Sequence, residues 1–376
     1  MRIGFDARLI NETGVGRYIR NLLSEFKRAD RHNQYFVFLN PLAYKSFSLP
    51  NKNWHKISID VRWHSIKEQL LMPKILKKYN LDLVHFPYFN VPLFYKGKYI
   101  LTVHDLIIDH FPTGRTSTLN PAIYFGKWLL YRYIMKKALK NAVKIFAISH
   151  STKSEIISHY GVKQNKIVVT YDALDKNLLE LKEKYKPKKH YAFDYFLYVG
   201  NAYPHKNLEK LCFSFADGKI NSQVKLVLAG DDWFFYQRLK SIVKEKKLEK
   251  HIIFFGKADD RELVDLYSHA RGLIIPSFME GFGLPPLEAV FFDLMPVISD
   301  IPVFREIWKN DLIYFNPESP VNIQKAIKVL LNLKKERLKI IISKAKKRLK
   351  LFSWENSAKV TLSQYQKISG KIDYHN

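Results

Sequence analysis

The chain has 376 residues, of which 47% are hydrophobic and 26% are charged, and 62 basic residues against 35 acidic ones give a formal net charge of +27. This composition is globular and suits two domains, which excludes an intrinsically disordered chain. The single cysteine, Cys212, excludes a disulfide framework and a cysteine-rich zinc site. The positive charge favours anionic partners such as nucleic acid, acidic lipid or sugar phosphates; a lysine-rich background composition is the alternative explanation.

The start of the chain and its hydropathy predict a protein that does not cross a membrane. The opening MRIGFDARLI lacks the apolar core and cleavage site of a signal peptide. No apolar run approaches the ~20 residues of a spanning helix. With the lone cysteine, this predicts a cytoplasmic protein, either free or peripheral on the inner face of the cytoplasmic membrane.

In the first half of the chain, short apolar strands alternate with amphipathic helices, which predicts a parallel α/β architecture. A helix is expected after the first strand because Tyr18, Leu22 and Phe26 fall on one face. The predicted strands are Arg2–Phe5, Leu81–Phe86, Tyr99–Val103, Lys144–Ile148 and Lys166–Thr170.

The second half repeats the alternation after a polar stretch, Leu181–His190, whose Pro187 and scarcity of apolar residues predict a linker. We therefore expect two doubly wound domains, residues 1–183 and 191–351, followed by a helix at Phe352–Ile368 within a final segment, 352–376. The predicted strands are Phe196–Gly200, Val224–Gly230, Ile252–Gly256, Gly272–Pro276, Pro296–Ser299 and Leu312–Phe315, and the predicted helices are Leu208–Ala216, Phe234–Lys247, Arg261–His269 and Pro286–Phe292.

Ligands of open parallel sheets bind at the carboxyl ends of strands, and one such end carries two carboxylates. After the strand that ends at Pro276, a glycine-bearing loop leads into a helix whose first turn is pre-set by two prolines. Glu280 lies in the loop and Glu288 about one turn inside the helix. The backbone amides of Phe282, Gly283 and Leu284 suit a diphosphate at a helix N-terminus. The alternative is structural: a dipole-favoured first-turn acid and a solvated loop residue.

The segment Glu280-Gly-Phe-Gly-Leu-Pro-Pro-Leu-Glu288 resembles the paired-glutamate motif of retaining glycosyltransferases of the GT4 type. Other segments resemble that family in the same chain order, so the resemblance covers essentially the whole sequence. They are Ile3-Gly-Phe-Asp-Ala-Arg8, Thr13-Gly-Val-Gly-Arg-Tyr18, His85-Phe-Pro87, Thr102-Val-His-Asp105, Ile148-Ser149, Tyr198-Val-Gly200, His205-Lys-Asn-Leu208 and Phe352-Ser-Trp-Glu355.

The resemblance implies a GT-B architecture: two Rossmann-like domains facing across a cleft, the second binding a nucleotide sugar, the first receiving the acceptor, and the last helix returning to the first domain. It implies that Glu288 binds the donor ribose, that Glu280 holds the transferring sugar, and that Lys206 neutralises the leaving diphosphate. Without the family resemblance, the alternative interpretation of Lys206 is a solvated loop residue.

Two departures from the family pattern stand out. The arginine that usually accompanies the lysine is absent, and Asn201 and His205 occupy the candidate positions, with His205 either a protonated substitute or a neutral hydrogen-bonding group. The usual glycine after the second glutamate is also missing from Phe291-Phe-Asp-Leu-Met-Pro296, which is expected to alter the C-terminal turn of that helix.

Three residues of the first domain are further candidates. Gly14 and Gly16 lie in a turn between a strand and a helix, where their amides would approach the donor phosphate. The resemblance places His104 beside the donor sugar, through its ring or its backbone carbonyl; a structural histidine is the alternative. His104-Asp105 has no third member for a triad, and the chain has no HExxH spacing and no Asp-x-Asp motif at a strand end, so no metal is expected.

The first half also contains an acid-free interval from His110 to Ser154, in which basic and aromatic residues are interleaved. A second basic stretch runs from Arg62 to Lys78 and includes Trp63, Lys67, Lys74 and Lys77. Such helices suit an anionic membrane surface, while a core helix with solvated lysines is the alternative. The interval holds Arg115, Tyr124, Phe125, Lys127, Trp128, Tyr131, Arg132, Tyr133, Lys136, Lys137, Lys140, Lys144 and Lys153.

The sequence therefore predicts transfer of a hexose, with mannose favoured by the resemblance, from a nucleotide diphosphate sugar to a glycan or lipid-linked acceptor in surface-polysaccharide assembly. The alternatives are a sugar-nucleotide epimerase or a glycan phosphorylase on the same fold. A nucleic-acid-binding protein, suggested only by the charge, is disfavoured because no helix-turn-helix, zinc or RNA-binding motif accompanies it.

Overall fold

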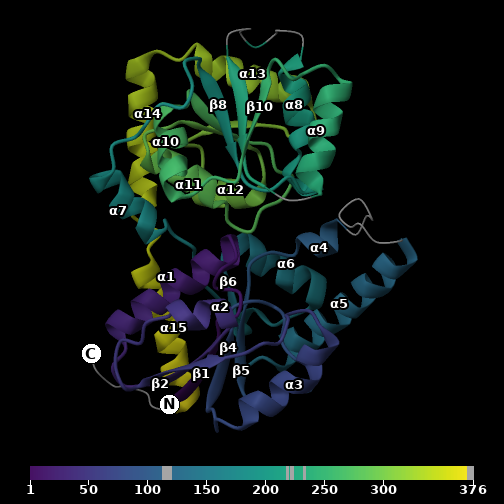
Figure 1. The fold of residues 1–376 in the computed structure, drawn as a ribbon, viewed down its shortest axis with the longest axis vertical. Helices are drawn as coiled ribbons and strands as arrows, with labels where there is room; N and C mark the ends of the chain where they lie inside the picture. The colour runs from purple at the N-terminus through teal and green to yellow at the C-terminus, as the bar shows by residue number, and fades with distance from the viewer. Residues whose placement is uncertain (112–120, 217–219, 221–223, 232–233, 371–376) are drawn as a thin grey trace. The chain divides into compact units, whose positions relative to one another are not determined.

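The computed structural model describes residues 1–111, 121–216, 220, 224–231 and 234–370, and it divides into two compact units (Figure 1). The first unit holds β1 to β7 and the C-terminal helix, and the second runs from Ala173 to Phe352. The side chains of residues 121–124 are not described, so the predictions for Arg115 and for the side chain of Tyr124 lie outside the described residues.

The first unit is built on a seven-stranded parallel sheet with the strand order β3-β2-β1-β4-β5-β6-β7. The chain moves outward from β1 through β2 to β3 and then returns to the other side of β1 with β4, which makes the ends of β1 and β4 a topological switch point. The strands are β1 (Arg2–Asp6), β2 (Gln34–Leu39), β3 (Trp54–Ser58), β4 (Leu83–Phe86), β5 (Tyr99–Val103), β6 (Lys144–Ala147) and β7 (Ile167–Val169).

Helices accompany these strands, and most of them begin with a capping interaction. Ser65, for example, accepts a hydrogen bond from Glu68 N at the start of α3, and Ser149 accepts one from Thr152 N at the start of α6. The helices are α1 (Gly14–Ala29), α2 (Pro41–Ser46), α3 (Ile66–Lys77), α4 (Ile107–His110), α5 (Pro121–Asn141), α6 (His150–Tyr160) and, at the C-terminus, α15 (Trp354–Ser369).

The C-terminal helix α15 packs along α1 in the first unit (Figure 1). The ring of Trp354 lies edge-on to Tyr18, with 5.8 Å between centroids. At the other end, the hydroxyl of Tyr365 lies 2.6 Å from Nδ1 of the buried His85 in β4. The last helix is thus held to the first unit both by apolar packing and by a buried hydrogen bond.

The second unit repeats the pattern with a six-stranded parallel sheet of order β10-β9-β8-β11-β12-β13, and its switch point lies between β8 and β11. The strands are β8 (Tyr195–Val199), β9 (Lys225–Ala229), β10 (Ile252–Gly256), β11 (Gly272–Ile275), β12 (Pro296–Ser299) and β13 (Ile313–Phe315). The helices are α7 (Lys176–Lys184), α8 (Leu208–Ser214), α9 (Phe235–Glu245), α10 (Asp260–His269), α11 (Leu284–Phe291), α12 (Pro302–Trp308), α13 (Pro320–Leu331) and α14 (Lys335–Leu349).

The stretch Leu181–His190, which the sequence predicts to be a linker, is tied into the second unit. Helix α7 continues through its first residues to Lys184. Beyond the helix, the buried carboxylate of Asp265 in α10 accepts hydrogen bonds from Lys188 N (2.7 Å) and the Tyr185 hydroxyl (3.2 Å). The division between the units falls earlier, between Asp172 and Ala173. The stretch belongs to the second unit because Tyr185 and Lys188 are hydrogen-bonded to Asp265 in α10.

The helix after the second glutamate keeps a left-handed turn without glycine. Helix α11 ends at Phe291, and Asp293 adopts φ 62°, a conformation that Asp tolerates better than most residues. Leu294 N then donates to Ala289 O at 2.9 Å, and Lys346 binds the Asp293 carboxylate at 2.5 Å. Asp293 therefore takes the left-handed position of the turn, which glycine commonly fills.

Candidate functional site

Two segments of the second unit meet at the carboxyl ends of β8 and β11. After β8 the chain passes Gly200 and forms one turn of 3-10 helix, Pro204–Lys206. After β11 a loop carries Ser277 and Glu280 to the start of α11. Neighbouring strands whose connections leave on opposite sides mark a topological switch point, the place where ligands of open parallel sheets bind.

Lys206 and Glu280 form an ion pair at this switch point. Nζ of Lys206 lies 2.8 Å from both carboxylate oxygens of Glu280, and the hydroxyl of Ser277 donates to one of those oxygens at 2.7 Å. The two side chains are 17% and 12% exposed. The charges therefore neutralise each other while both side chains stay partly exposed to solvent.

Asn207 fixes the turn that presents Lys206. It adopts a left-handed conformation (φ 59°), and its side-chain amide donates to the carbonyls of Pro276 (2.9 Å) and Pro317 (2.8 Å). One buried amide thus ties together the segments that follow β8, β11 and β13. The sequence segment His205-Lys-Asn-Leu208 contained this residue, but nothing in its pattern indicated a positioning role.

Glu288 lies inside α11 and is buried, with 1% of its surface exposed. Its Oε2 accepts a hydrogen bond of 2.6 Å from the hydroxyl of Tyr267 in α10, and Tyr267 stacks on Phe292 with 5.6 Å between ring centroids. The carboxylate is therefore anchored from the α10 side. Sequence reasoning did not find Tyr267, which reads there as an ordinary core aromatic.

Two prolines limit the backbone amides that the start of α11 can offer to a ligand. Gly283 caps the helix with φ +89°, and a Cβ at this position would lie 2.4 Å from the Phe304 ring. Leu284 is the first helical residue, and the next two residues, Pro285 and Pro286, have no N–H. The side chain of Phe282 is buried edge-on against Phe352. Any anion at this end must therefore use amides at or before Leu284.

His205 and Asn201 lie in the segment after β8. Burial lowers the pKa of His205 to about 2, and the neighbouring Lys206 charge acts in the same direction. The ring is therefore neutral at physiological pH, which disfavours its interpretation as a protonated substitute for arginine. Oδ1 of Asn201 is buried and has no hydrogen-bond partner among the described residues, so an incoming donor group would satisfy it.

His104, Gly14 and Gly16 belong to the first unit. Nε2 of His104 donates to the carbonyl of Pro87 at 2.8 Å, and burial lowers the pKa of this histidine to about 4. A neutral ring that donates through Nε2 carries an acceptor lone pair on Nδ1. Gly14 has open space where a side chain would begin, whereas a Cβ on Gly16 would lie 2.7 Å from the carbonyl of Ile10. Gly16 is therefore required by packing.

Neither a metal cluster nor a membrane span is found in the parts of the chain that the structure describes. No group of three or more His, Cys, Asp or Glu side chains is arranged there to hold a metal ion. Over the same residues, no helix combines the length and the apolar composition needed to cross a bilayer.

Comparisons with known proteins identify relatives of this chain in sequence and in fold. Two relatives are the O-antigen chain mannosyltransferase RfbU of Salmonella typhimurium, 29% identical over 304 residues (79% of this chain and 78% of that one), and the O-antigen chain mannosyltransferase B of Escherichia coli, 25% identical over 384 residues (94% and 96%). The solved structure of Anabaena Alr3699/HepE in complex with UDP and glucose matches with a TM-score of 0.71 at 16% identity, over 97% of this chain and 99% of that one.

Two family models divide the chain between them. The model described as glycosyl transferases group 1 matches residues 179–348, which include Lys206, Glu280 and Glu288, and the model described as glycosyltransferase family 4 matches residues 13–178. Their order along the chain follows the two parallel sheets. The protein thus belongs to the group 1, family 4 glycosyltransferases, which have the GT-B fold.

Proposed function

We propose that this glycosyltransferase moves a hexose, with retention of configuration and without a metal ion, from a nucleotide diphosphate sugar to a glycan or lipid-linked acceptor. The observation that carries the proposal is the 2.8 Å ion pair of Lys206 and Glu280 at the switch point of the second sheet. A nucleotide sugar needs a cation for its diphosphate and acceptors for its hydroxyls, and this pair supplies both. Mannose is favoured because both relatives described above are mannosyltransferases.

In this proposal, Lys206 exchanges its partner Glu280 for the diphosphate when the donor binds. The diphosphate competes with Glu280 for the ammonium group, and the released carboxylate accepts hydrogen bonds from the hexose hydroxyls. The bond between the anomeric carbon and the diphosphate oxygen then breaks, and the acceptor hydroxyl oxygen forms the new bond. Its proton leaves with the nucleoside diphosphate or passes to solvent. Fixed positive charge contributes most where the leaving group gains charge, so Lys206 carries the largest effect.

The remaining donor contacts are assigned from burial and hydrogen-bonding capacity. Glu288 binds the ribose hydroxyls while Tyr267 holds its other side, and Oδ1 of Asn201 accepts a donor-side N–H or O–H. Phe282, Gly283 and Leu284 contribute backbone amides, and His205 contributes a neutral ring. Gly14, Gly16 and His104 stay predictions, because no observation within one unit tests them.

We further propose that the first unit docks on an anionic membrane surface, where a lipid-linked acceptor resides. Large apolar side chains are exposed on the two basic helices: Ile66 is 82% exposed on α3, and Phe125 and Tyr133 are each 58% exposed on α5. Tyr131 on α5 instead faces inward and packs edge-on against Phe89, with 5.1 Å between ring centroids. Exposed apolar groups among lysines complement an acidic lipid surface, to which each nearby basic residue contributes on the order of 1 kcal/mol at low salt.

The transfer proposal is tested with a panel of nucleotide diphosphate sugars that vary in base and hexose. The true donor at ~100 times its dissociation constant should stabilise the protein by about 2.7 kcal/mol, which a thermal shift detects. With acceptor present, the product linkage should keep the donor's anomeric configuration by NMR. Release of nucleotide without any acceptor would instead support an epimerase, and a requirement for free phosphate or pyridoxal phosphate would support a phosphorylase.

The docking proposal is tested by co-sedimentation with vesicles. Binding to anionic vesicles at low salt should be lost at 1 M salt, where the Debye length falls to about 3 Å. Equal partitioning to neutral and anionic vesicles, or to neither, would contradict it.

A further inference from the structure

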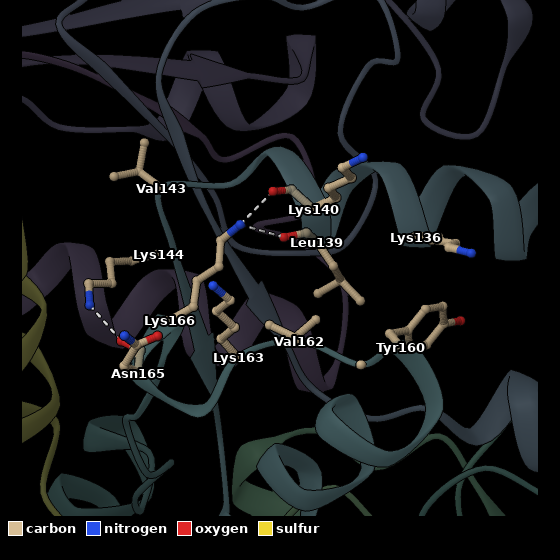
Figure 2. A pocket seen from close by; sticks show the side chains of 11 residues that line it. Lys136, Leu139, Lys140, Val143, Lys144, Tyr160, Val162, Lys163, Asn165 and Lys166 are labelled. Carbon is tan, nitrogen blue, oxygen red and sulfur yellow. Dashed lines mark hydrogen bonds between the residues drawn. The ribbon is translucent and has the colours of Figure 1, made fainter.

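A pocket of about 490 Å³ lies in the first unit at the amino edge of its sheet (Figure 2). It is enclosed by the end of α5, the end of α6 and the loop that leads into β7. Lys144 is the first residue of β6 and Lys166 immediately precedes β7, whereas His104 follows the opposite, carboxyl end of β5. The proposed hexosyl transfer does not use this pocket.

The lining of the pocket is strongly basic. Eleven residues form it, and none is an Asp or Glu. Figure 2 shows lysines from α5, from the start of β6 and from the segment before β7 among the lining side chains. The five lysines are Lys136, Lys140, Lys144, Lys163 and Lys166.

Two of these lysines hold the walls together. Nζ of Lys166 donates to the carbonyls of Leu139 (2.9 Å) and Lys140 (2.6 Å), which end α5, and Nζ of Lys144 donates to the carbonyl of Asn165 at 2.7 Å. Figure 2 marks these bonds with dashed lines. A cation at a helix C-terminus is favoured by the exposed carbonyls there, which explains Lys166. Lys144 ties the start of β6 to the segment before β7.

The other three lysines do not have that explanation. Lys136, Lys140 and Lys163 are exposed, and within the described residues their ammonium groups have no hydrogen-bond or carboxylate partner. Lys136 and Lys140 lie one turn apart on α5, where like charges destabilise a helix. A bound anion would relieve the repulsion between the two ammonium groups. Without a bound anion, that repulsion remains.

Apolar groups complete the pocket. Leu139 is fully buried at its base, and Val143 and Val162 line the sides. The ring of Tyr160 forms a further wall, with its hydroxyl held by Asp109 at 2.6 Å. The volume is several times that of an inorganic phosphate, so a larger group with an uncharged part would fill it.

We propose that this pocket binds a phosphate-bearing anion through Lys136, Lys140 and Lys163, with the uncharged part of the ligand against Val143, Val162 and Tyr160. Such an anion has two sources, a free diphosphate or a lipid headgroup that carries a terminal phosphate. The chemistry of recognition is the same for both, because mobile ammonium groups bind phosphate as point charges.

The first arm of the test measures pyrophosphate binding by calorimetry in the full chain carrying Lys206→Ala, which removes the donor's phosphate group contact. One site per chain is expected. Adding Lys136→Gln, Lys140→Gln and Lys163→Gln should weaken binding at least tenfold. Adding Lys244→Gln, Lys250→Gln and Lys257→Gln, which remove the same charge from exposed lysines of the second unit, should leave it unchanged. Equal loss in both sets, or no binding in the parent, would overturn the proposal.

The second arm distinguishes the sources with vesicles of matched surface charge containing phosphatidic acid or phosphatidylserine. A headgroup site should favour phosphatidic acid, whose phosphate is terminal, and the preference should vanish in the pocket variant but not in the charge-matched one. Pyrophosphate binding without a lipid preference would assign the pocket to a free anion. Neither arm measures nucleotide binding at Lys206. A negative result would therefore overturn the pocket proposal without affecting the proposed hexosyl transfer, and the pocket test stays valid if the transfer proposal is wrong.

Discussion

The two sheets have the same kind of strand topology, but the charged side chains at their switch points differ in how deeply they are buried. In each unit the first strand lies inside the sheet, and the chain crosses it from one side to the other. In the second unit, Lys206 and Glu280 stay partly exposed. In the first, Arg8 is enclosed between Asp6 and Glu68, with side-chain exposures of 4% for Arg8 and 0% for Glu68. The topology fixes where ligand-binding loops lie, and burial decides whether a charge is available to a ligand or holds the loops.

The largest expected effect is loss of stability on removing the buried cation of the first unit. Arg8→Met should destabilise the protein by about 3–5 kcal/mol, because the buried carboxylates of Asp6 (2.6 Å) and Glu68 (2.5 Å) lose the cation that neutralises them. Urea denaturation measures the change. Arg28→Met, at an arginine that is 61% exposed beside Glu25, should cost far less. Similar losses of unfolding free energy in both variants would mean that burial of the arginine does not determine its contribution to stability.

The next effect concerns the partly exposed cation of the second unit. Lys206→Ala should lower turnover by about 10²–10³-fold, the effect of losing one group that stabilises developing charge. Chelator should leave the wild-type rate unchanged. Lys210→Ala is the matched control, since Lys210 lies one turn further on and binds the exposed Glu318 at 2.8 Å. Activity abolished by EDTA and restored by magnesium or manganese would refute the metal-free mechanism.

A buried acid in the first unit predicts a pH dependence of stability. Burial raises the pKa of Asp172 to about 8, and its Oδ1 has no hydrogen-bond partner within the described residues. Between its ordinary pKa and 8, the folded protein keeps a proton that the unfolded chain releases, so this group's contribution to stability falls by about 1.4 kcal/mol per pH unit as pH rises. Asp172→Asn should remove this slope and be more stable than wild type at pH 7. Parallel pH profiles of the two proteins would contradict the burial argument.

A smaller effect, on nucleotide affinity, is expected from substitution of Glu288, whose buried carboxylate is proposed to bind the donor ribose. Glu288→Ala should weaken binding of both nucleotide and nucleotide sugar by roughly 1–3 kcal/mol, the range for a hydrogen bond to a charged group. Calorimetry with the bare nucleotide measures it. Tyr267→Phe, which removes only the anchoring hydroxyl 2.6 Å away, should have a smaller effect in the same direction. Unchanged affinity in a folded Glu288→Ala protein would remove the ribose assignment.

The sequence predicted most of the parallel strands to within one or two residues, because buried apolar runs between turns are a strong signal. It did not predict β2 or β3. The run Gln34–Leu39 is apolar on both faces and shows no alternation, and Trp54–Ser58 at the sheet edge carries His55 and Lys56. The polar stretch after α7 read as a linker, since its partner Asp265 lies far away in sequence.

The site residues Lys206, Glu280 and Glu288 were recognisable only through their motifs. The ion pair joins residues 74 positions apart, and no local pattern indicates such a contact. The neutral state of His205 depends on burial and on Lys206 beside it. Asn207 and Tyr267 act through carbonyl and carboxylate partners on other segments, so their roles required the packed structure.

The most direct test of the central claim separates the two members of the Lys206–Glu280 pair. In a Glu280→Gln protein, calorimetry with the bare nucleoside diphosphate should give an affinity equal to or higher than that of wild type, because Lys206 no longer has a competing carboxylate at 2.8 Å. Its turnover should nevertheless fall by roughly 10²-fold, since the contact to the transferring hexose is lost. Equal losses of nucleotide affinity and turnover would contradict the assignment of Lys206 to the diphosphate and Glu280 to the sugar.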